Sequence, residues 1–287
     1  TAQAEYHFVS LNYFLKMRQD EGMMEEYNWL EEHQSMYEAD STQLAAFLFL
    51  RSLFSMKEVP DAEEETQRNL TRLLSLGRSH GYDYFEASAL NSLASAMLSG
   101  AEMRPSRRVF VSELVGEDDY SGYEEDWVWW LAEKARQKAH RYGNAFAETT
   151  ALVTLSNYYL QQGEDSMALA QMEQAVHLIN AHHRTMCEHL GEKNVKADSL
   201  RLYDEDGEYL STEMRWIANP SIVAVPEWMA MVREQLSVVY GAMGLKAESD
   251  YNHNVYFDIL DATRQDLRVQ QEEAHLKQEE RTLNLNR

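Results

Sequence analysis

Histidines and the single cysteine gather in HLINAHHRTMCEH, the stretch with the clearest potential for metal chemistry. Cys187 lies there among His177, His182, His183 and His189. On a helix, His183 and Cys187 share one face, and imidazole with thiolate suits zinc or copper. The chain has only one cysteine, and no carboxylate–histidine pattern is fixed. We therefore favour the alternative, a polar helix end whose histidines complement the helix dipole, and predict neither a metal nor a cofactor.

Three tryptophans, Trp127, Trp129 and Trp130, follow an acidic tract over 117–126. Aromatic rings beside carboxylates can form a cage for a cationic or sugar-like ligand. Trp127 and Trp130 are three residues apart and share a helix face, which favours burial of that pair in the core. Trp129 points elsewhere and is the candidate ligand-binding residue.

Known catalytic and ion-binding motifs are absent from the sequence. There is no P-loop, no G-x-S-x-G, no H-E-x-x-H and no kinase signature. The acidic run Glu63-Glu64-Glu65 complements the start of a helix and lacks the spaced oxygen ligands of a calcium loop. We predict that this stretch of protein is not an enzyme. A catalytic site assembled from distant residues is the third and weakest interpretation.

Composition indicates helices. Of 287 residues, 44% are hydrophobic, with only 12 Gly and 4 Pro, and the common residues are good helix formers. The net charge of −22 repels phosphate backbones and anionic lipid, so we expect no nucleic-acid partner. No run of 18 apolar residues is present to span a membrane. The chain starts at Thr1 without a signal peptide, and we interpret it as an excised or processed fragment.

The stretch 147–178 reads as two amphipathic helices with a turn at Gly163-Glu164-Asp165. Leu152, Leu155, Tyr159 and Leu160 recur at three- and four-residue steps and share one face of the first helix. In the second helix the equivalent face carries Ala168, Met172, Ala175 and Val176. Gly163 suits the left-handed end of the first helix, and Asp165 or Ser166 can cap the second.

This spacing resembles one tetratricopeptide (TPR) unit, the helix-turn-helix repeat. Leu155, Tyr159, Gly163, Ala168 and Ala175 stand at motif positions, whereas Ser156 and Asn180 replace its first Gly and closing Pro. One unit cannot bury its apolar faces alone, so neighbours are expected on both sides. Such arrays bind ligands on a concave face. In this unit the residues expected there are Thr150, Val153, Asn157 and Gln161.

Further helix pairs are predicted around this unit. One covers 5–40, with Gly22 in its turn, and another covers 41–80, where Ser41-Thr42 caps a helix that is apolar nearly all round. The sequence at 86–98 echoes 148–160, pairing Glu86 with Glu148 and Leu93 with Leu155. An interruption near 100–123 is either an insertion loop or a frayed stretch. A second irregular segment near 190–225 includes a candidate hairpin turn at Asp206-Gly207.

The last pair begins at Glu227, and its second helix covers 247–260. From residue 261 the chain is polar and helix-forming, with Ala262, Val269, Leu276 and Leu283 seven apart. This is half of a coiled-coil seam. Two interpretations stay open: a solvated helix extension, or a two-stranded linker that makes a homodimer. We therefore predict an all-α, TPR-like helical-repeat solenoid over 1–260 and a C-terminal linker helix over 261–287.

Part of the last third resembles a known family. The segments NP at 219–220, VPEW at 225–228, REQLS at 233–237, SDYN at 249–252 and DILDATRQD at 258–266 are similar to the membrane-proximal end of TPR-like sensor regions in Bacteroidetes-type membrane histidine kinases. The resemblance covers about residues 205–270. It implies an extracytoplasmic, periplasmic sensor in two-component signal transduction, with a membrane span outside this chain and a kinase beyond it.

No catalytic residue transfers from the family, because the kinase core is absent here. No ligand follows from the resemblance, which implies only that the helix over 261–287 is a juxtamembrane signalling stalk. We hypothesise that an unknown peptide, protein or small-molecule signal binds the concave face and is relayed through this C-terminal helix. The alternative function is a TPR-type protein-interaction scaffold without transmembrane signalling. An apolar span after Arg287 distinguishes the two.

Overall fold

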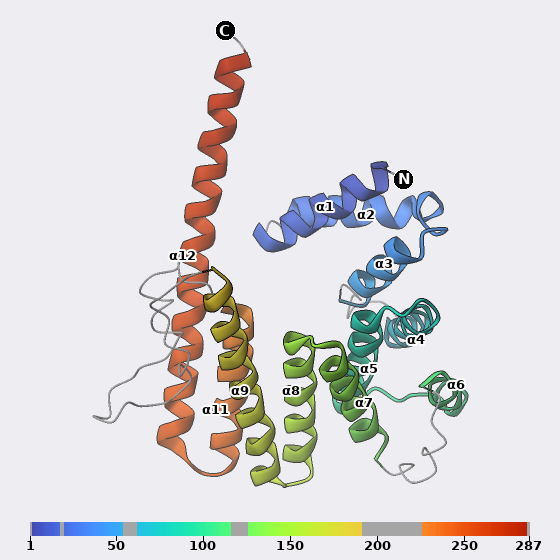
Figure 1. Cartoon of the computed structure of the whole chain (residues 1–287), viewed down its shortest axis with the longest axis vertical. Helices are drawn as coiled ribbons and strands as arrows, with labels where there is room; N and C mark the ends of the chain where they lie inside the picture. Colours follow the sequence, from blue (N-terminus) through green and yellow to red (C-terminus); the bar gives the residue numbers. More distant parts are fainter. Residues whose placement is uncertain (1, 18–19, 54–61, 116–125, 191–225, 286–287) are drawn as a thin grey trace. The chain divides into compact units, whose positions relative to one another are not determined.

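The computed structural model describes residues 2–17, 20–53, 62–115, 126–190 and 226–285, and within these ranges every regular element is a helix. The all-α prediction is confirmed, while the TPR-like form of the solenoid stays a prediction. The helices (Figure 1) are α1 (Ala2–Met17), α2 (Asp20–Glu32), α3 (Ser41–Leu53), α4 (Ala62–His80), α5 (Asp83–Leu98), α6 (Pro105–Val115), α7 (Trp127–Tyr142), α8 (Ala145–Gln161), α9 (Asp165–Leu190), α11 (Pro226–Ala242) and α12 (Lys246–Leu285), with a 3-10 turn at Gln34–Met36. The chain divides into two compact units, 1–154 and 155–287.

The turns on either side of α8 share one geometry. Gly143, between α7 and α8, has φ 78°, and Gly163, between α8 and α9, has φ 75°. The N–H of Asn144 donates to the carbonyl of Ala139 at 3.0 Å, and Glu164 donates to Tyr159 at 2.9 Å. Each bond closes a left-handed glycine turn of the kind that ends helices, in which a side chain would be strained. The prediction that Gly163 ends its helix is confirmed.

The first unit begins with a cluster in which α1, α2 and α3 pack together. Its buried side chains are Ala4, Phe8, Leu11, Tyr27, Leu30, Tyr37, Phe47 and Leu50. The predicted turn at Gly22 is wrong, because Gly22 lies inside α2. The Phe14 ring covers it so closely that a Cβ there would lie 2.7 Å from Phe14 Cε1. Gly22 therefore serves the contact between two helices rather than the turn.

The start of α3 differs from the prediction in its capping residue. Asp40, rather than Ser41 or Thr42, accepts the backbone N–H groups of Thr42 and Gln43 through Oδ1, at 3.0 and 3.1 Å. The hydroxyls of Ser41 and Thr42 instead bond the phenol of Tyr82, at 2.8 and 3.0 Å. A carboxylate at this place satisfies two free N–H groups and complements the helix dipole.

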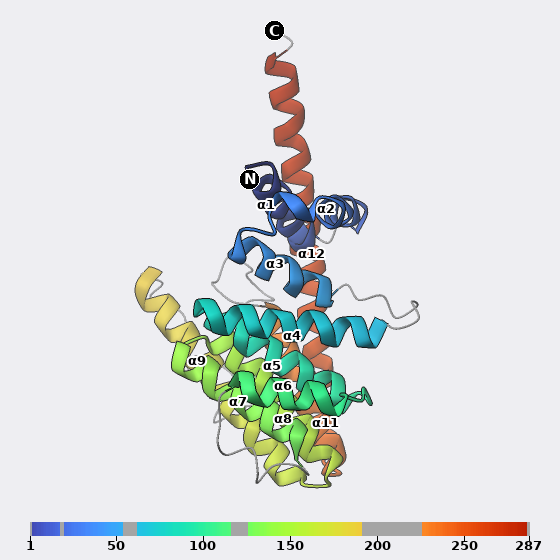
Figure 2. The same ribbon diagram turned by 90° about the vertical axis from the view of Figure 1, so that its right-hand side faces the viewer.

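Helices α5 and α7 pack against each other, and α4 lies beside α5 in both ribbon views (Figures 1 and 2). The expected match between Glu86 and Glu148 has a structural counterpart: both side chains are buried. Glu86 pairs with Arg78 and with Lys138, each at 2.9 Å. Glu148 lies 3.1 Å from His140 Nδ1. In both places a buried glutamate meets a basic side chain from the end of the preceding helix.

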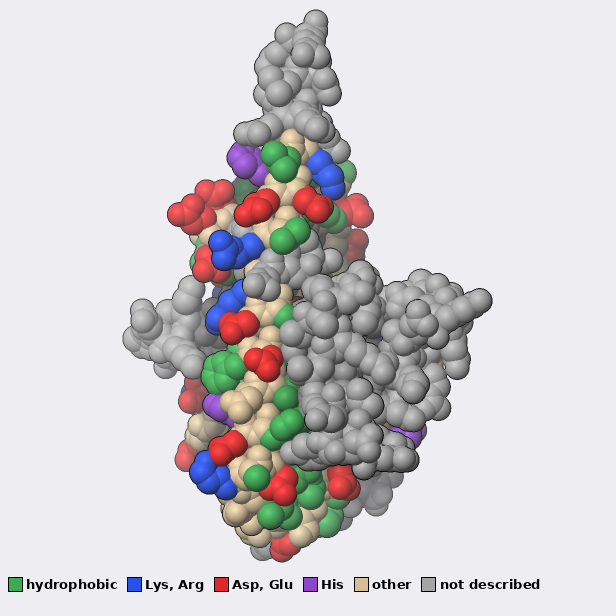
Figure 3. All heavy atoms as spheres, turned by 90° about the vertical axis from the view of Figure 1, so that its left-hand side faces the viewer, with side chains coloured by type: hydrophobic (Ala, Val, Ile, Leu, Met, Phe, Trp, Pro, Cys, Tyr) green, Lys and Arg blue, Asp and Glu red, His purple; other side chains and the backbone are tan. Residues whose placement is uncertain are grey.

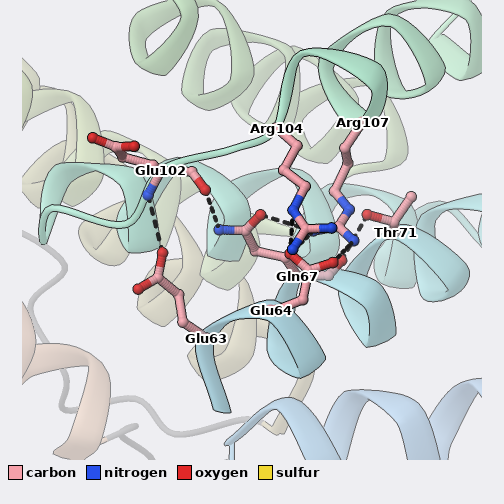
Figure 4. Close-up of polar contacts among 7 residues, drawn as sticks. All are labelled: Glu63, Glu64, Gln67, Thr71, Glu102, Arg104 and Arg107. Atoms are coloured by element: carbon pink, nitrogen blue, oxygen red, sulfur yellow. Dashed lines mark hydrogen bonds and ion pairs between the residues drawn. The ribbon is translucent and has the colours of Figure 1, made fainter. Parts of the chain in front are cut away.

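Most of the segment expected as a loop or frayed stretch near 100–123 is helical where it is described. Helix α6 begins at Pro105, which suits a first helical turn. Arg107 holds it to α4 through two bonds to Glu64, at 2.6 and 3.1 Å (Figure 4). Gln67 Nε2 donates to the carbonyl of Glu102, and Glu102 N–H donates to Glu63. The acidic run of α4 therefore anchors α6, besides lying in the first turn of its own helix.

In the second unit α11 and α12 form an antiparallel pair (Figure 1). Their apolar contact includes Met229, Val255 and Ile259. Arg233, fully buried, donates to Asn252 Oδ1 at 2.8 Å. Several residues that carry the family resemblance thus hold this pair together.

The predicted boundary at residue 261 lies inside α12, which continues as one helix from Lys246 to Leu285. Among the described side chains of α12, burial ends at Thr263, and the exposed ones that follow include Val269 and Leu276. Hydrophobic, acidic and basic side chains are mixed along the part of this face that Figure 3 colours. The boundary marks a change of surroundings rather than a break in the helix.

The irregular segment expected near 190–225 lies mostly outside the described residues, and so does the hairpin turn expected at Asp206-Gly207. The Asn219-Pro220 motif of the resemblance falls in the same range.

Candidate ligand-binding site

The residues predicted to face a ligand in the central unit all lie on α8. Asn157 Oδ1 accepts a hydrogen bond from Gln235 Nε2 of α11 at 2.9 Å, and the same amide donates to Ser156 at 3.1 Å. The hydroxyl of Thr150 donates to the carbonyl of Ala147. Val153 is half-buried, and Gln161 is exposed. Asn157 is thus engaged within the protein, and ligand binding by Thr150, Val153, Asn157 and Gln161 stays a prediction.

The tryptophans at the start of α7 follow the expected division of faces. Trp127 and Trp130 are buried, and their rings stack with centroids 4.8 Å apart. Trp129 is half-buried. The core interpretation of the first two is confirmed, while a ligand role for Trp129 stays a prediction.

The histidine-rich stretch forms the second half of α9. His182 packs against the buried Trp228 of α11, with ring centroids 5.0 Å apart, and burial lowers its pKa. The side chains of His183, Cys187 and His189 lie outside the described residues. Where side chains are described, no three metal-ligating residues gather.

A pocket of about 580 Å³ lies between α1, α3 and α5 of the first unit. Its size is that of small-molecule sites. Apolar and aromatic side chains make most of its wall: Phe8, Val9, Ala46, Phe49, Leu50 and Phe85. Phe8 and Leu50 also belong to the core cluster of α1, α2 and α3. This part of the wall is therefore held in place by the core of the unit, whereas Val9 is exposed.

The polar part of the lining comes from Glu5, Asn12, Asp40, Thr42 and Gln43, together with Tyr84. Two of these are carboxylates, and none of the lining residues is Lys, Arg or His. Burial raises the pKa of Tyr84, so its hydroxyl stays neutral at physiological pH. The side-chain oxygen Oε1 of Gln43 is shielded from solvent and has no hydrogen-bond partner among the described residues. The lining thus combines apolar rings with two carboxylates and contains no basic residue.

Sequence reasoning did not find this pocket, although one signal pointed toward it. The helix at 41–53 is apolar nearly all round, which requires neighbours on more than one side. In the structure α3 packs against α4 and shares the core cluster of α1 and α2. The pocket lies where α3 leaves a space beside α1 and α5. The lining residues are far apart in sequence and have no motif spacing.

The fold and the site define an all-α protein of paired helices with a small-molecule-sized pocket. Residues 142–286 match the family described as a domain of unknown function, DUF5113, and the chain belongs to that family. No curated protein and no solved structure matches the chain. The matched region contains α8, α9, α11 and α12, whereas the pocket lies before it. In the described part of the chain, no helix is both long and apolar enough to cross a membrane.

Proposed function

We propose that this chain is the periplasmic sensor region of a two-component membrane histidine kinase. It binds a small-molecule, peptide or protein signal, and α12 relays the bound state. The observation that carries the proposal is the course of α12. The helix packs against α11 as far as Ala262, burial ends at Thr263, and the helix then continues to Leu285 with exposed side chains wherever they are described.

This arrangement suits signal relay because one rigid element links a buried contact to a distant end. A change in the packing of α11 and α12 moves the whole of α12, since no turn interrupts it. Val269 and Leu276 are 54% and 60% exposed and lie seven residues apart. A second copy of the chain could cover them by pairing along the seam, as in a two-stranded coiled coil.

The first test is to read the coding region that follows Arg287. We expect about 20 consecutive apolar residues, enough for a membrane span, and then kinase motifs. A stop codon or another soluble domain there would refute the sensor function and favour the protein-interaction scaffold.

The second test changes the phase of α12 in the full-length protein. Two alanines inserted between Arg268 and Val269 rotate the following part of the helix by about 200°, whereas seven alanines restore the face to within about 20°. We expect the first insertion to alter autophosphorylation and the second to preserve it. Equal activity in both variants would show that the helix phase carries no signal.

A further inference from the structure

We propose that the pocket between α1, α3 and α5 binds a small organic cation, with its hydrocarbon body against the phenylalanines and its ammonium group near Glu5 and Asp40. The inference names the ligand class of the proposed sensor and rests on that function only for its biological meaning. Binding itself is a property of the pocket.

The shape and chemistry of the wall select the body of the ligand. A volume of about 580 Å³ accommodates a small molecule. Phe49 lies edge-on to Tyr84, with ring centroids 5.9 Å apart, and its ring centroid is 6.1 Å from that of Phe85. Aromatic surfaces of this kind bury hydrocarbon and also attract cations through the negative faces of their rings.

The charge of the lining favours a ligand of positive charge. Glu5 and Asp40 carry negative charge, and no basic residue lines the pocket to balance it. Asp40 also accepts two N–H groups at the start of α3, so its carboxylate is held in one position. The whole chain has a net charge of −22, which adds to the repulsion of anions and attracts cations from solution.

Gln43 lines the pocket and carries a shielded acceptor that a rotation can bring to a ligand. Its Oε1 has no partner among the described residues, and a shielded acceptor without a bond is costly. A rotation about the last side-chain torsion, which is broad for an amide, lets a ligand N–H supply the missing bond. An ammonium group offers such donors, whereas a carboxylate ligand offers none.

The binding test compares three molecules of nearly equal shape: phenethylammonium, the neutral 2-phenylethanol, and the anion phenylacetate. Each is titrated into the purified chain and followed by calorimetry and by NMR of the protein. We expect saturable binding of phenethylammonium, binding of the alcohol that is at least about 5-fold weaker, and no binding of the anion. Equal binding of the alcohol or the anion, or no saturable binding of the cation, would overturn the proposal.

Two charge variants locate the site. Glu5→Gln and Asp40→Asn keep the side-chain shape, and Asn is as good a helix cap as Asp. Both carboxylates are exposed. We therefore expect each change to weaken the binding of phenethylammonium by about 2- to 5-fold, the range for an exposed ion pair. Glu38→Gln is the matched control, because Glu38 is exposed and does not line the pocket. Unchanged affinity in both pocket variants, or an equal loss in the control, would overturn the proposal.

The outcomes separate the pocket from the proposed sensor function. If the insertions in α12 change kinase output but phenethylammonium does not bind, the ligand class is wrong and the relay stands. If the cation binds and the insertions have no effect, the proposed ligand site is supported and the proposed relay through α12 is refuted.

Discussion

Glu86 and Glu148 are a matched pair for testing what a buried carboxylate contributes in this fold. Both lie in the first turn of a helix that follows a glycine turn, and both are 3% exposed. The perturbation is Glu86→Gln compared with Glu148→Gln. Each change removes one charge and keeps the side-chain volume. The difference between the two losses of unfolding free energy therefore reports how strongly each glutamate interacts with its partners.

From the structure we expect the larger loss of unfolding free energy for Glu86→Gln. Glu86 meets two cations, Arg78 and Lys138, each at 2.9 Å. Burial alone would lower the pKa of Lys138, but Glu86 and Asp83 outweigh it and raise that pKa. A hydrogen bond to a charged group contributes about 1.5–3 kcal/mol. The cations are partly exposed, which screens them, so we expect Glu86→Gln to cost about 2 kcal/mol.

Glu148 has weaker partners. The nearest guanidinium nitrogen, Arg136 Nη1, is 3.6 Å away, and Arg136 is already bonded to Glu133 through two nitrogens. His140, the other partner, is 71% exposed. We therefore expect Glu148→Gln to cost less than about 1 kcal/mol.

The assay is urea unfolding at neutral pH followed by circular dichroism. With a slope of about 2 kcal/mol per molar urea, the Glu86 variant should unfold at a midpoint about 1 M lower than the unaltered chain. Hydrogen exchange of peptides from α5 and α7 reports the same unit directly. Adding Lys138→Met completes a double-mutant cycle, for which we expect a coupling of about 1 kcal/mol.

Two results would refute this reasoning. One is a Glu148→Gln cost equal to or above that of Glu86→Gln, which would mean that distance and exposure of the cations do not decide the cost. The other is a coupling of zero between Glu86 and Lys138, which would mean that their contact does not stabilise the unit.

Three further changes test the packing of the first unit. Gly77→Ala should destabilise the chain by about 1–3 kcal/mol in urea unfolding, because the new Cβ would lie 3.0 Å from the backbone nitrogen of Glu86. Alanine otherwise favours helices over glycine, so a stabilised variant would contradict the close approach of α4 and α5. The bond from Arg107 lowers the pKa of Glu64 below its ordinary 4.5, so the stabilisation by this ion pair is present above that pH and is lost as the pH falls through the lowered pKa. The melting temperatures of Glu64→Gln and of the unaltered chain should therefore differ at neutral pH and converge in acid. A difference that stays constant with pH would refute the ion pair. Phe47→Ala should cost about 3–5 kcal/mol in urea unfolding, since Phe47 is fully buried, and a cost below 1 kcal/mol would contradict the cluster of α1, α2 and α3.

The helix pairs were predictable because their signals are local. Apolar residues at three- and four-residue steps mark the buried faces of α8 and α9, where Leu152, Leu155 and Met172 are indeed buried. Gly163 marks the turn between them. Each of these features is decided by residues within one or two helical turns, so the sequence alone contains the physical cause.

Contacts between helices were harder to predict because their partners are distant in sequence. Gly22 looked like a turn residue, but it lies in α2, where the ring of Phe14 leaves no room for a Cβ. Glu64 looked like a helix-start charge, and its partner Arg107 lies on another helix. The candidate pocket is lined by α1, α3 and α5 together, and no local sequence pattern predicts a space between three helices.

The continuity of α12 has a mechanical consequence. Beyond Thr263 the helix extends to Leu285, about 33 Å at ~1.5 Å per residue. It is therefore a lever arm with its fulcrum at the contact with α11. A tilt of about 5° at the fulcrum displaces the far end by about 3 Å, because the helix has a fixed rise and no joint. A rearrangement too small to disturb the core of the unit thus becomes a displacement of atomic size at the far end.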